Sequence, residues 1–280
     1  MAMKIGFLIT ARLKSTRLPF KILKDLNGKT VIERVIERAK EINGISDIVL
    51  CTSPNPQDRS LIDVADKNNI SYFLGDENDV LKRLLDAATM HKLNYFLGIT
   101  ADNPLFSIRY SNLIVDLIKK KQYDFIKLKG LPLGTATYGM KLKALKTVCT
   151  VKTIVDTEIW GHLIERPEVF DIKVINIKGK LNRPEIRLTL DYQEDYELIN
   201  NIYSNMTFKK ILNLEKVIDY LDRNPKIAQI NKRCIQRDLD ERIKKKIDRN
   251  FKENLEEIKK IKNKIYKTGI EFEKKGELKL

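Results

Sequence analysis

Short apolar runs alternate with amphipathic stretches through residues 1–200. The runs are rich in β-branched and aromatic residues and are bounded by polar or turn residues, as buried strands are. The stretches between them repeat apolar residues every three or four positions, as helices packed on a sheet do. This alternation predicts an α/β fold with a doubly wound, mostly parallel central sheet, in which ligands bind beside the carboxyl ends of the strands.

The same patterns give the expected element boundaries. Expected strands are Lys4–Ile9, Asp47–Thr52, Ile70–Leu74, Asn94–Thr100, Tyr123–Leu128, Thr137–Leu142, Val169–Ile177 and Glu185–Leu190. Expected helices are Thr30–Glu41, Asp58–Lys67, Asp79–Met90, Ile114–Lys121 and Gln193–Tyr203. Because the chain becomes richer in strands after the fourth helix, we expect a smaller mixed-sheet region in its second half.

Positive charge is concentrated at the end of the chain. Residues 207–280 hold 22 of the 53 Lys and Arg residues but 13 of the 38 Asp and Glu residues. Isoleucine, leucine and phenylalanine recur there every three or four positions between Ile235 and Ile265, which predicts a long amphipathic helix or a helix pair. We therefore divide the chain into an α/β domain, residues 1–206, and a basic, mostly helical C-terminal extension, residues 207–280.

The extension admits two interpretations. Its apolar stripe must be buried, either on its own domain or against a second chain. Its lysines are interspersed with isoleucine, asparagine and glutamate and few aromatic residues accompany them, so a solvated helix face is favoured over a nucleic-acid-binding surface.

The sequence predicts a cytoplasmic protein that binds no membrane. No stretch approaches the roughly 18 consecutive apolar residues that a membrane span requires, and basic residues from Lys4 to Arg17 interrupt the N-terminal segment where a signal peptide is apolar. Cys51, Cys149 and Cys234 form no C-x-x-C pair. Reduced thiols are therefore expected, with neither a disulfide framework nor a zinc site.

A basic loop follows the first expected strand, in the segment Ile9–Leu23 (ITARLKSTRLPFKIL). Arg12, Arg17 and Lys21 are four or five positions apart in it. Guanidinium groups, an ammonium group and backbone N–H groups on one loop can converge on a polyphosphate. The spacing matches no generic phosphate-binding loop, so an exposed basic connection is the alternative.

Two aspartates follow expected strands that are far apart in the sequence. Asp102 follows the strand 94–100, and Asp191 ends the strand 185–190. Two carboxylates at the carboxyl ends of strands in one sheet can bind one Mg²⁺ that also holds a triphosphate. Either aspartate alone could be a turn former or a helix cap. Together with the basic loop, the pair favours a site for a magnesium nucleotide.

The basic loop resembles the A-R-x-x-S-T-R-L-P-x-K-x-L signature of the cytidylyltransferases that make CMP-activated sugars. The resemblance is greatest to the spore-coat polysaccharide biosynthesis branch, to which the CMP-Kdo and acylneuraminate cytidylyltransferases are related. Four further segments resemble family motifs in the same order, so that the resemblance extends over residues 4–203. They are Asn55–Asp58 (NPQD), Gly75–Arg83 (GDENDVLKR), Thr100–Leu105 (TADNPL) and Leu188–Glu197 (LTLDYQEDYE).

This resemblance implies an enzyme, a Mg²⁺-dependent cytidylyltransferase. It would transfer CMP from CTP to an anionic sugar or related acceptor, release pyrophosphate, and serve surface polysaccharide or glycoconjugate biosynthesis. The implied fold is that of the nucleotide-diphospho-sugar transferases, with a region for acceptor and dimer contacts at about residues 123–185 and a homodimer as the assembly. The alternatives are a transferase of the same fold that uses another nucleotide or nucleotide sugar, and a non-catalytic basic binding protein.

The resemblance also implies roles for individual residues. Asp102 and Asp191 would bind the metal. Arg12, Arg17 and Lys21 would contact the phosphates, with Arg17 and Lys21 stabilising charge on the triphosphate and the leaving pyrophosphate. These five are the expected catalytic residues, whereas Asp195 is expected to be a first-turn charge on its helix. Expected nucleotide-binding residues are Ala11, Arg12, Ser15, Arg17, Lys21, Thr52, Asn55, Asp79, Arg83 and Thr100.

The acceptor half departs from the family pattern, which suggests a different nucleophile. Leu131–Met140 (LPLGTATYGM) lacks the acidic residue often found shortly after its glycine, and Asp156–His162 (DTEIWGH) stands in place of an R-E-H element. Within the second segment, His162 could line the acceptor pocket, although a structural role is favoured. Trp160 could pack on a sugar face, in the core or at a dimer contact. In the basic loop, Phe20 stands where the family branch usually has glycine.

Overall fold

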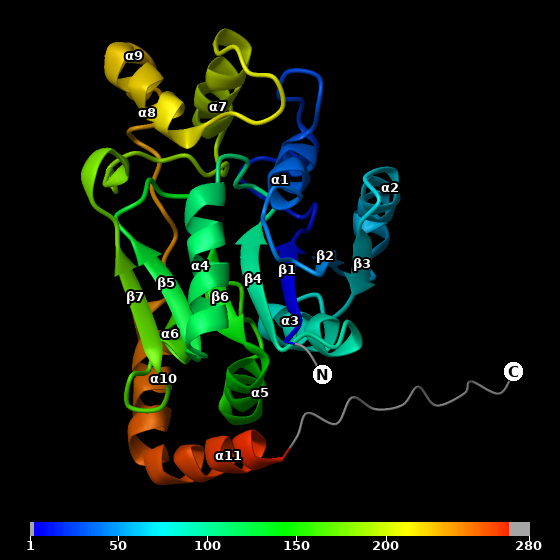
Figure 1. Cartoon of the computed structure of the whole chain (residues 1–280), viewed down its shortest axis with the longest axis vertical. Helices are drawn as coiled ribbons and strands as arrows, with labels where there is room; N and C mark the ends of the chain where they lie inside the picture. Colours follow the sequence, from blue (N-terminus) through cyan, green and yellow to red (C-terminus); the bar gives the residue numbers. More distant parts are fainter. Residues whose placement is uncertain (1–2, 269–280) are drawn as a thin grey trace, which may run out of the picture.

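A seven-stranded sheet runs through the part of the protein that the computed structural model describes, residues 3–268 (Figure 1). Its strand order is β3-β2-β1-β4-β6-β5-β7. Every neighbouring pair is parallel except those of β6, which is antiparallel to both β4 and β5. The predicted doubly wound, mostly parallel sheet is therefore confirmed. The strands expected to form the smaller mixed-sheet region continue this same sheet.

Seven of the eight expected strands form. They are β1 (Ile5–Thr10), β2 (Asp47–Thr52), β3 (Ser71–Leu74), β4 (Tyr95–Thr100), β5 (Phe125–Lys129), β6 (Tyr138–Lys141) and β7 (Ile172–Asn176). In the register of the sheet, Thr10 lies between Cys51 of β2 and Thr100 of β4. The carboxyl ends of these three strands therefore meet at one edge of the sheet, and the loops that leave them share that edge.

The prediction of a strand at Glu185–Leu190 is wrong. Only one isolated bridge forms there, between Leu133 and Arg187. Leu133 donates to the carbonyl of Ile186 and accepts the N–H of Leu188, both at 2.8 Å. The pairing extends no further because Pro132 has no N–H and the backbone turns at Gly134, where φ is +87°. Asp191 therefore follows an extended loop instead of a strand.

Helices cover both faces of the sheet. They are α1 (Val31–Ala39), α2 (Ser60–Lys67), α3 (Val80–Met90), α4 (Ile108–Lys120), α5 (Leu142–Val151), α6 (Gly161–Ile164), α7 (Gln193–Asn205), α8 (Leu214–Arg223), α9 (Pro225–Ala228), α10 (Glu241–Glu253) and α11 (Leu255–Lys267). Thr30 and Asp79 act as N-caps of α1 and α3. The helix expected from Ile114 begins earlier because Ser107 caps α4, accepting the N–H of Tyr110 at 3.4 Å.

The sheet separates two hydrophobic cores, as the alternation of side chains along a strand requires. In β1, Phe7 and Ile9 face the core that contains side chains of α1, α4, α7 and α8. Leu8 faces the opposite core, which contains side chains of α3, α5, α6, α10 and α11. The C-terminal extension thus contributes to both cores.

The C-terminal extension forms the helix pair α10 and α11 where a long helix or a helix pair was expected. Its apolar stripe packs on the α/β core itself, where Ile247, Phe251 and Ile258 are at most 2% exposed. Two polar contacts tie α11 to the sheet, because Lys262 and Tyr266 bind the buried carboxylate of Asp124 at 2.7 and 2.6 Å. At these positions the stripe is therefore buried against the chain's own α/β domain, whereas Ile235 at its start is 76% exposed. Its residues 269–280 lie outside the described residues.

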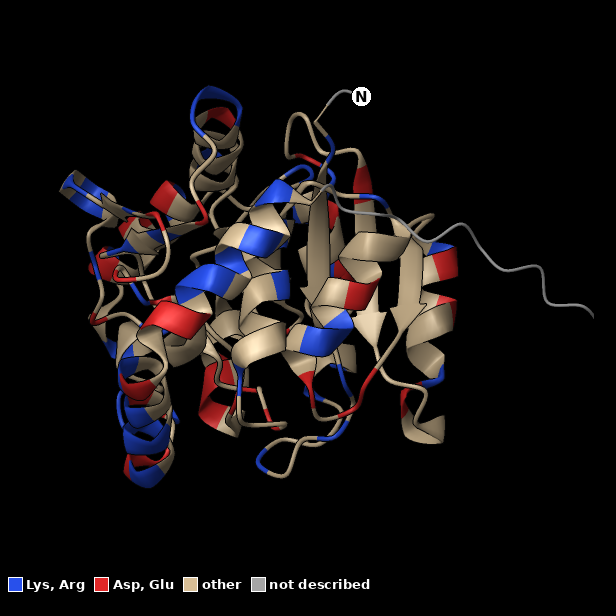
Figure 2. Cartoon of the chain, turned by 90° about the horizontal axis from the view of Figure 1, so that it is seen from below, with Lys and Arg blue, Asp and Glu red and all other residues tan. Residues whose placement is uncertain are grey.

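Lys and Arg positions are spread along the described helices and loops, and Asp and Glu positions lie among them (Figure 2). Along α10 and α11, Lys244 pairs with Asp238 and Glu241, and Lys259 pairs with Glu256. Such mixing is typical of solvated helix faces. No helix among residues 3–268 is both long and apolar enough to cross a membrane.

Candidate active site

The basic loop leaves the carboxyl end of β1 and extends to the 3₁₀ turn that begins at Lys21. Ala11 donates its N–H to a carbonyl of β2 at 3.1 Å, and Ser15 accepts the N–H of Leu18 at 3.3 Å. Phe20 adopts a φ of +52°, in the left-handed region that favours glycine, immediately before a 3₁₀ turn at Lys21–Leu23. The loop thus keeps a glycine-type turn despite the bulky residue there, whose side chain is 50% exposed.

Lys21 lies between the two aspartates that the sequence singled out. Its Nζ is 2.5 Å from Oδ2 of Asp102 and 2.8 Å from Oδ1 of Asp191. Arg17 donates to the same oxygen of Asp191 at 2.9 Å and to the hydroxyl of Tyr192 at 3.3 Å. Two loops that are far apart in sequence are therefore joined by charge-assisted hydrogen bonds at the carboxyl edge of the sheet.

The charges in this cluster shift the pKa values of its members. Burial alone would lower the pKa of Lys21, but the carboxylates of Asp102 and Asp191 outweigh burial and raise it. Burial alone would raise the pKa of Asp191, but Lys21, Arg17 and Arg187 outweigh it and hold this pKa below its usual range. Both groups therefore stay charged at neutral pH.

Asp191 is supported from behind by a buried ion pair. Arg187 donates to Oδ2 of Asp191 at 2.8 Å and to both oxygens of Asp195 at 2.9 and 3.1 Å. Asp195 also accepts the backbone N–H groups of Asp191 and Tyr192, and the amide of Asn231 at 2.8 Å. Asp195 is a first-turn residue of α7, as predicted, and it also fixes the loop that carries Asp191.

Asp102 is oriented by short polar contacts on its own loop. Its Oδ1 accepts from the hydroxyl of Thr100 at 2.5 Å and from the amide of Asn103 at 3.0 Å. Gly134 passes so close that a Cβ there would lie 2.6 Å from both Oδ1 of Asn103 and the backbone nitrogen of Thr189. The loop of Asp102 and the extended segment before Asp191 can therefore approach each other only because residue 134 is glycine.

A second group of expected site residues gathers around the carbonyl of Glu77. Arg12 donates to this carbonyl at 2.6 Å and Arg83 at 3.3 Å, while Arg83 also donates to the carbonyl of Asp76 at 2.6 Å. Asn55 donates to the carboxylate of Glu77 at 3.5 Å. Arg12 thus lies at the far end of the basic loop from Lys21, so the loop connects the two groups.

Two buried polar atoms in this second group have no hydrogen-bond partner among the described residues. They are Oγ1 of Thr52 and Nε of Arg83, whose side chains are 0% and 1% exposed. Gly75 lies next to both residues: it donates its N–H to the carbonyl of Thr52, and a Cβ added to it would lie 2.8 Å from Cγ of Arg83. Buried groups of this kind are costly unless something binds them.

Asp79 is used within the fold. It caps α3 by accepting the N–H of Lys82 at 3.0 Å, accepts the hydroxyl of Thr157 at 3.0 Å and forms an ion pair with Lys152. Its oxygens are therefore engaged in holding α3 and the segment that follows α5.

Trp160 and His162 lie on the side of the sheet covered by α3, α5, α6, α10 and α11. The ring of Trp160 packs edge-on against Tyr138, with ring centroids 4.8 Å apart, and against Phe125. His162 is on α6, which packs on α5 and α10, and its carbonyl accepts Nε of Arg166 at 2.8 Å. Core packing, one of the options for Trp160, is therefore what the structure shows.

The aspartate pair fits a divalent cation. An ammonium group already sits within 2.8 Å of one oxygen from each carboxylate, so the space between them suits positive charge. Mg²⁺ is commonly bound by one or two carboxylates together with phosphate oxygens and water. No group of three or more His, Cys, Asp or Glu side chains suited to a metal occurs within residues 3–268. Asp102 and Asp191 would therefore hold the metal only together with the phosphates of a nucleotide.

Sequence reasoning missed Arg187, Asn231 and Tyr192. Arg187 had a signal, because an arginine inside an apolar run (EIRLTL) needs a buried acid, and Asp191 and Asp195 lie four and eight positions later. Asn231 had none, since it reaches this cluster only through the packing of the C-terminal extension.

Known proteins resemble the chain over most of its length. A family model described as cytidylyltransferase matches residues 7–272. An uncharacterized protein of Methanocaldococcus jannaschii is 29% identical over 237 residues, which cover 84% of this chain and 97% of that protein. The spore coat polysaccharide biosynthesis protein SpsF of Bacillus subtilis is 24% identical over 231 residues, which cover 80% of this chain and 96% of that protein.

A solved structure has the same fold. The cytidylyltransferase from Leptospira borgpetersenii serovar Hardjo-bovis superposes with a TM-score of 0.76 and is 27% identical in sequence. The superposition covers 85% of this chain and all of the other chain.

Proposed function

Because this chain belongs to the cytidylyltransferase family, we propose that it transfers CMP from CTP to an anionic sugar or a related acceptor, with Mg²⁺ and release of pyrophosphate. That the chain is a nucleotidyltransferase follows from the family itself. The similarity to a spore coat polysaccharide biosynthesis protein supports a product destined for surface polysaccharide.

The convergence of Lys21 with Asp102 and Asp191 carries this proposal. In the reaction, an oxygen of the acceptor bonds to the α-phosphorus while the bond from that phosphorus to the bridging oxygen of pyrophosphate breaks. The transition state gathers negative charge, which fixed cations stabilise. Bound Mg²⁺ would neutralise part of this charge and hold the triphosphate in place. Lys21 and Arg17 are placed to exchange an aspartate oxygen for a phosphate oxygen when the nucleotide binds.

The second group of residues offers contacts for the rest of the nucleotide. Arg83 Nε and Thr52 Oγ1 are the buried, unpartnered polar atoms there. We assign them, with Asn55, to the side of the site that meets the nucleoside, and we assign Arg12, which lies at this end of the basic loop, to the phosphates next to it. The basic loop then spans the nucleotide from this group to the aspartates.

A pyrophosphate-release assay tests the function. The purified full-length protein is given CTP, UTP, GTP or ATP with a panel of sugar acids and sugar phosphates, in Mg²⁺ or in a chelator. Release from CTP that needs both an acceptor and the metal is expected. Release from another nucleotide would instead favour the transferase of different nucleotide specificity, and no release with any of the four would refute the proposal.

We also propose a homodimer, as the family resemblance implies, and a cytoplasmic location. Light scattering of the full-length protein measures its mass in solution. A monomer at all concentrations would refute the dimer, and recovery with a membrane or extracellular fraction would refute the location.

A further inference from the structure

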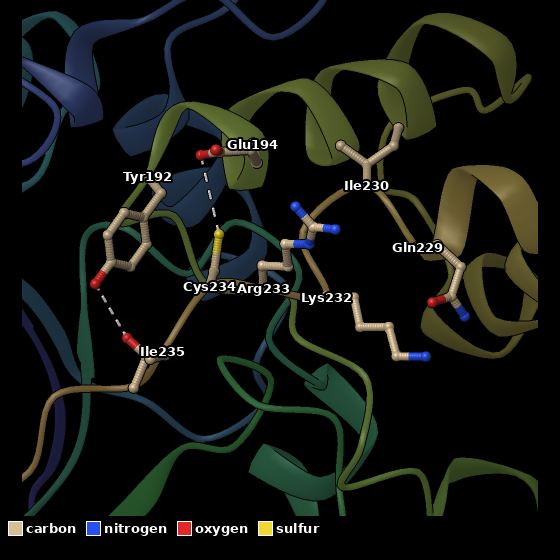
Figure 3. A pocket seen from close by; sticks show the side chains of 8 residues that line it. All are labelled: Tyr192, Glu194, Gln229, Ile230, Lys232, Arg233, Cys234 and Ile235. Atoms are coloured by element: carbon tan, nitrogen blue, oxygen red, sulfur yellow. Dashed lines mark hydrogen bonds between the residues drawn. The ribbon is translucent and has the colours of Figure 1, made fainter.

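Tyr192 joins the basic loop to the C-terminal extension through its hydroxyl group. It follows Asp191 directly and is the N-cap residue of α7. Its hydroxyl oxygen lies 3.3 Å from Nη1 of Arg17 and 3.2 Å from the carbonyl oxygen of Ile235. Figure 3 shows the contact with Ile235, beside the open cavity that Tyr192 separates from the aspartates. The hydroxyl therefore connects an expected phosphate ligand with a segment 43 positions further along the chain than Tyr192.

The two partners of this hydroxyl require opposite roles of it. A phenolic hydroxyl has one hydrogen to donate, and the lone pairs of its oxygen can accept. The carbonyl of Ile235 can only accept, so the hydrogen of Tyr192 points toward it. The guanidinium of Arg17 can only donate, so it meets the lone pairs. Because hydrogen bonds in a chain polarise one another, the contact with Ile235 strengthens the contact with Arg17.

The ring of Tyr192 also contacts Arg17. The guanidinium carbon lies 4.9 Å from the centre of the ring, within the range of a cation–π contact. Burial alone would lower the pKa of Arg17, but the hydrogen bond to Tyr192 and the carboxylate of Asp191 outweigh burial and raise it. Ring and hydroxyl together therefore fix where the charged end of Arg17 lies.

The carbonyl of Ile235 is itself held in place. The next residue, Gln236, accepts Nη1 of Arg187 through its Oε1 at 2.7 Å. Asn231, earlier in the same segment, is 4% exposed and donates to the carbonyl of Arg187 at 3.0 Å. Both ends of the segment 231–236 are thus tied to one buried arginine. The direction in which Tyr192 presents its oxygen to Arg17 is fixed as a result.

The two terminal nitrogens of Arg17 have different partners. Nη2 donates to Oδ1 of Asp191 at 2.9 Å, whereas Nη1 donates to Tyr192. The side chain of Arg17 is 27% exposed, so a ligand can still reach it. When Nη2 exchanges the aspartate oxygen for a phosphate oxygen, Nη1 can keep its contact with Tyr192. The guanidinium then stays in place throughout the exchange.

We propose that Tyr192 is a positioning residue, which holds Arg17 while that arginine exchanges Asp191 for a phosphate oxygen of the nucleotide. This inference rests on the proposed function. Tyr192 acts through Arg17 and needs no contact with a substrate of its own. Without the hydroxyl, only the ring would hold Arg17 once it has left Asp191. The C-terminal extension thereby contributes to nucleotide binding through one backbone carbonyl, that of Ile235.

Tyr192→Phe tests the proposal, because it removes the hydroxyl and keeps the ring. The full-length variant is titrated with CTP and Mg²⁺ in a calorimeter, and its pyrophosphate release is measured with the same acceptor panel. The dissociation constant for CTP should rise about tenfold, since a hydrogen bond to a charged group is lost. The value of kcat/KM for CTP should fall by about the same factor or more.

Tyr196→Phe is the matched control. Tyr196 lies on α7, its hydroxyl donates to the carbonyl of Asp25 at 2.8 Å, and Nζ of Lys24 lies 4.9 Å from the centre of its ring. The control thus removes a hydroxyl of the same kind that does not contact Arg17. It should change the affinity for CTP by less than about twofold. Equal affinities for CTP in Tyr192→Phe and Tyr196→Phe would overturn the proposal.

A double-mutant cycle separates positioning from a general loosening of the loop. Arg17→Met removes the guanidinium. If Tyr192 acts through Arg17, adding Tyr192→Phe to Arg17→Met should weaken CTP binding by less than about twofold, against about tenfold in the parent protein. The same tenfold loss in both backgrounds would show that the hydroxyl acts through the fold and would overturn the proposal.

The inference and the proposed function fail separately, and inorganic triphosphate distinguishes the two failures. If CTP does not bind, but triphosphate binds and the cycle couples Tyr192 to Arg17, the proposed function is refuted and the positioning role stands. If CTP binds and reacts, but Tyr192→Phe matches the parent protein, the proposed function stands and the positioning role is refuted. Binding of neither CTP nor triphosphate would refute both.

Discussion

Replacing Asp195 by alanine should destabilise the protein strongly, although this residue touches no proposed substrate. Its carboxylate is fully buried and accepts from Arg187, Asn231 and two backbone N–H groups. Truncation leaves the guanidinium of Arg187 with one carboxylate in place of two. Removing one partner of a buried, hydrogen-bonded ion pair costs about 3–5 kcal/mol.

This loss is measured by urea denaturation, in which the free energy of unfolding in water should fall by about 3–5 kcal/mol. Glu197→Ala is the matched control, because Glu197 lies on the same helix, α7, and is exposed. Its free energy of unfolding should change by about 0.5 kcal/mol or less. A loss below about 1 kcal/mol for Asp195→Ala would refute the view that this carboxylate supports the loop of Asp191.

Three further predictions concern the aspartate site. Asp102→Asn should lower the rate of pyrophosphate release on the order of 100-fold or more while circular dichroism stays that of the parent; full activity would remove Asp102 from the metal site. Gly134→Ala should destabilise by more than about 1 kcal/mol in the same urea assay, because a Cβ would meet the backbone of Thr189 at 2.6 Å and φ is positive; unchanged stability would contradict this crowding. The pKa of Asp191 is lower in the folded than in the unfolded protein, so its ion pairs stabilise the fold above about pH 4 and are lost as pH falls through the folded value. Asp191→Asn should therefore make unfolding free energy depend less steeply on acidic pH, and an unchanged slope would show that this carboxylate is not paired.

Most of the strands and helices could be predicted from the spacing of apolar residues. This is because a parallel strand that is buried on both faces needs a nearly continuous run of apolar side chains. β2 (Asp47–Thr52) lies at its expected residues, and the other strands that form differ from expectation only near their ends. The expected strand at Glu185–Leu190 alternates apolar and polar residues, yet the segment it pairs with is interrupted by Pro132 and Gly134. Apolar residues in a segment indicate that it is buried. Whether it forms a hydrogen-bonded strand pair depends also on the backbone of the segment beside it.

The site was predictable only in part, for a similar reason. The motifs named Lys21, Asp102 and Asp191, and the structure brings these side chains together. Motifs mark the groups that face a ligand, whereas the groups behind them depend on packing. Asn231 lies in a segment without a recognisable sequence pattern. Its contact with Asp195 could not be predicted because it depends on how the extension packs against α7.

The C-terminal extension therefore has a physical role beyond covering apolar surface. Through Asn231 it donates to Asp195, whose carboxylate holds both Arg187 and the backbone of Asp191. These three hydrogen bonds are all buried, so water cannot replace a missing partner at low cost in free energy. Asn231 belongs to the C-terminal extension, and Asp191 belongs to the α/β domain. The extension therefore helps to fix the position of Asp191.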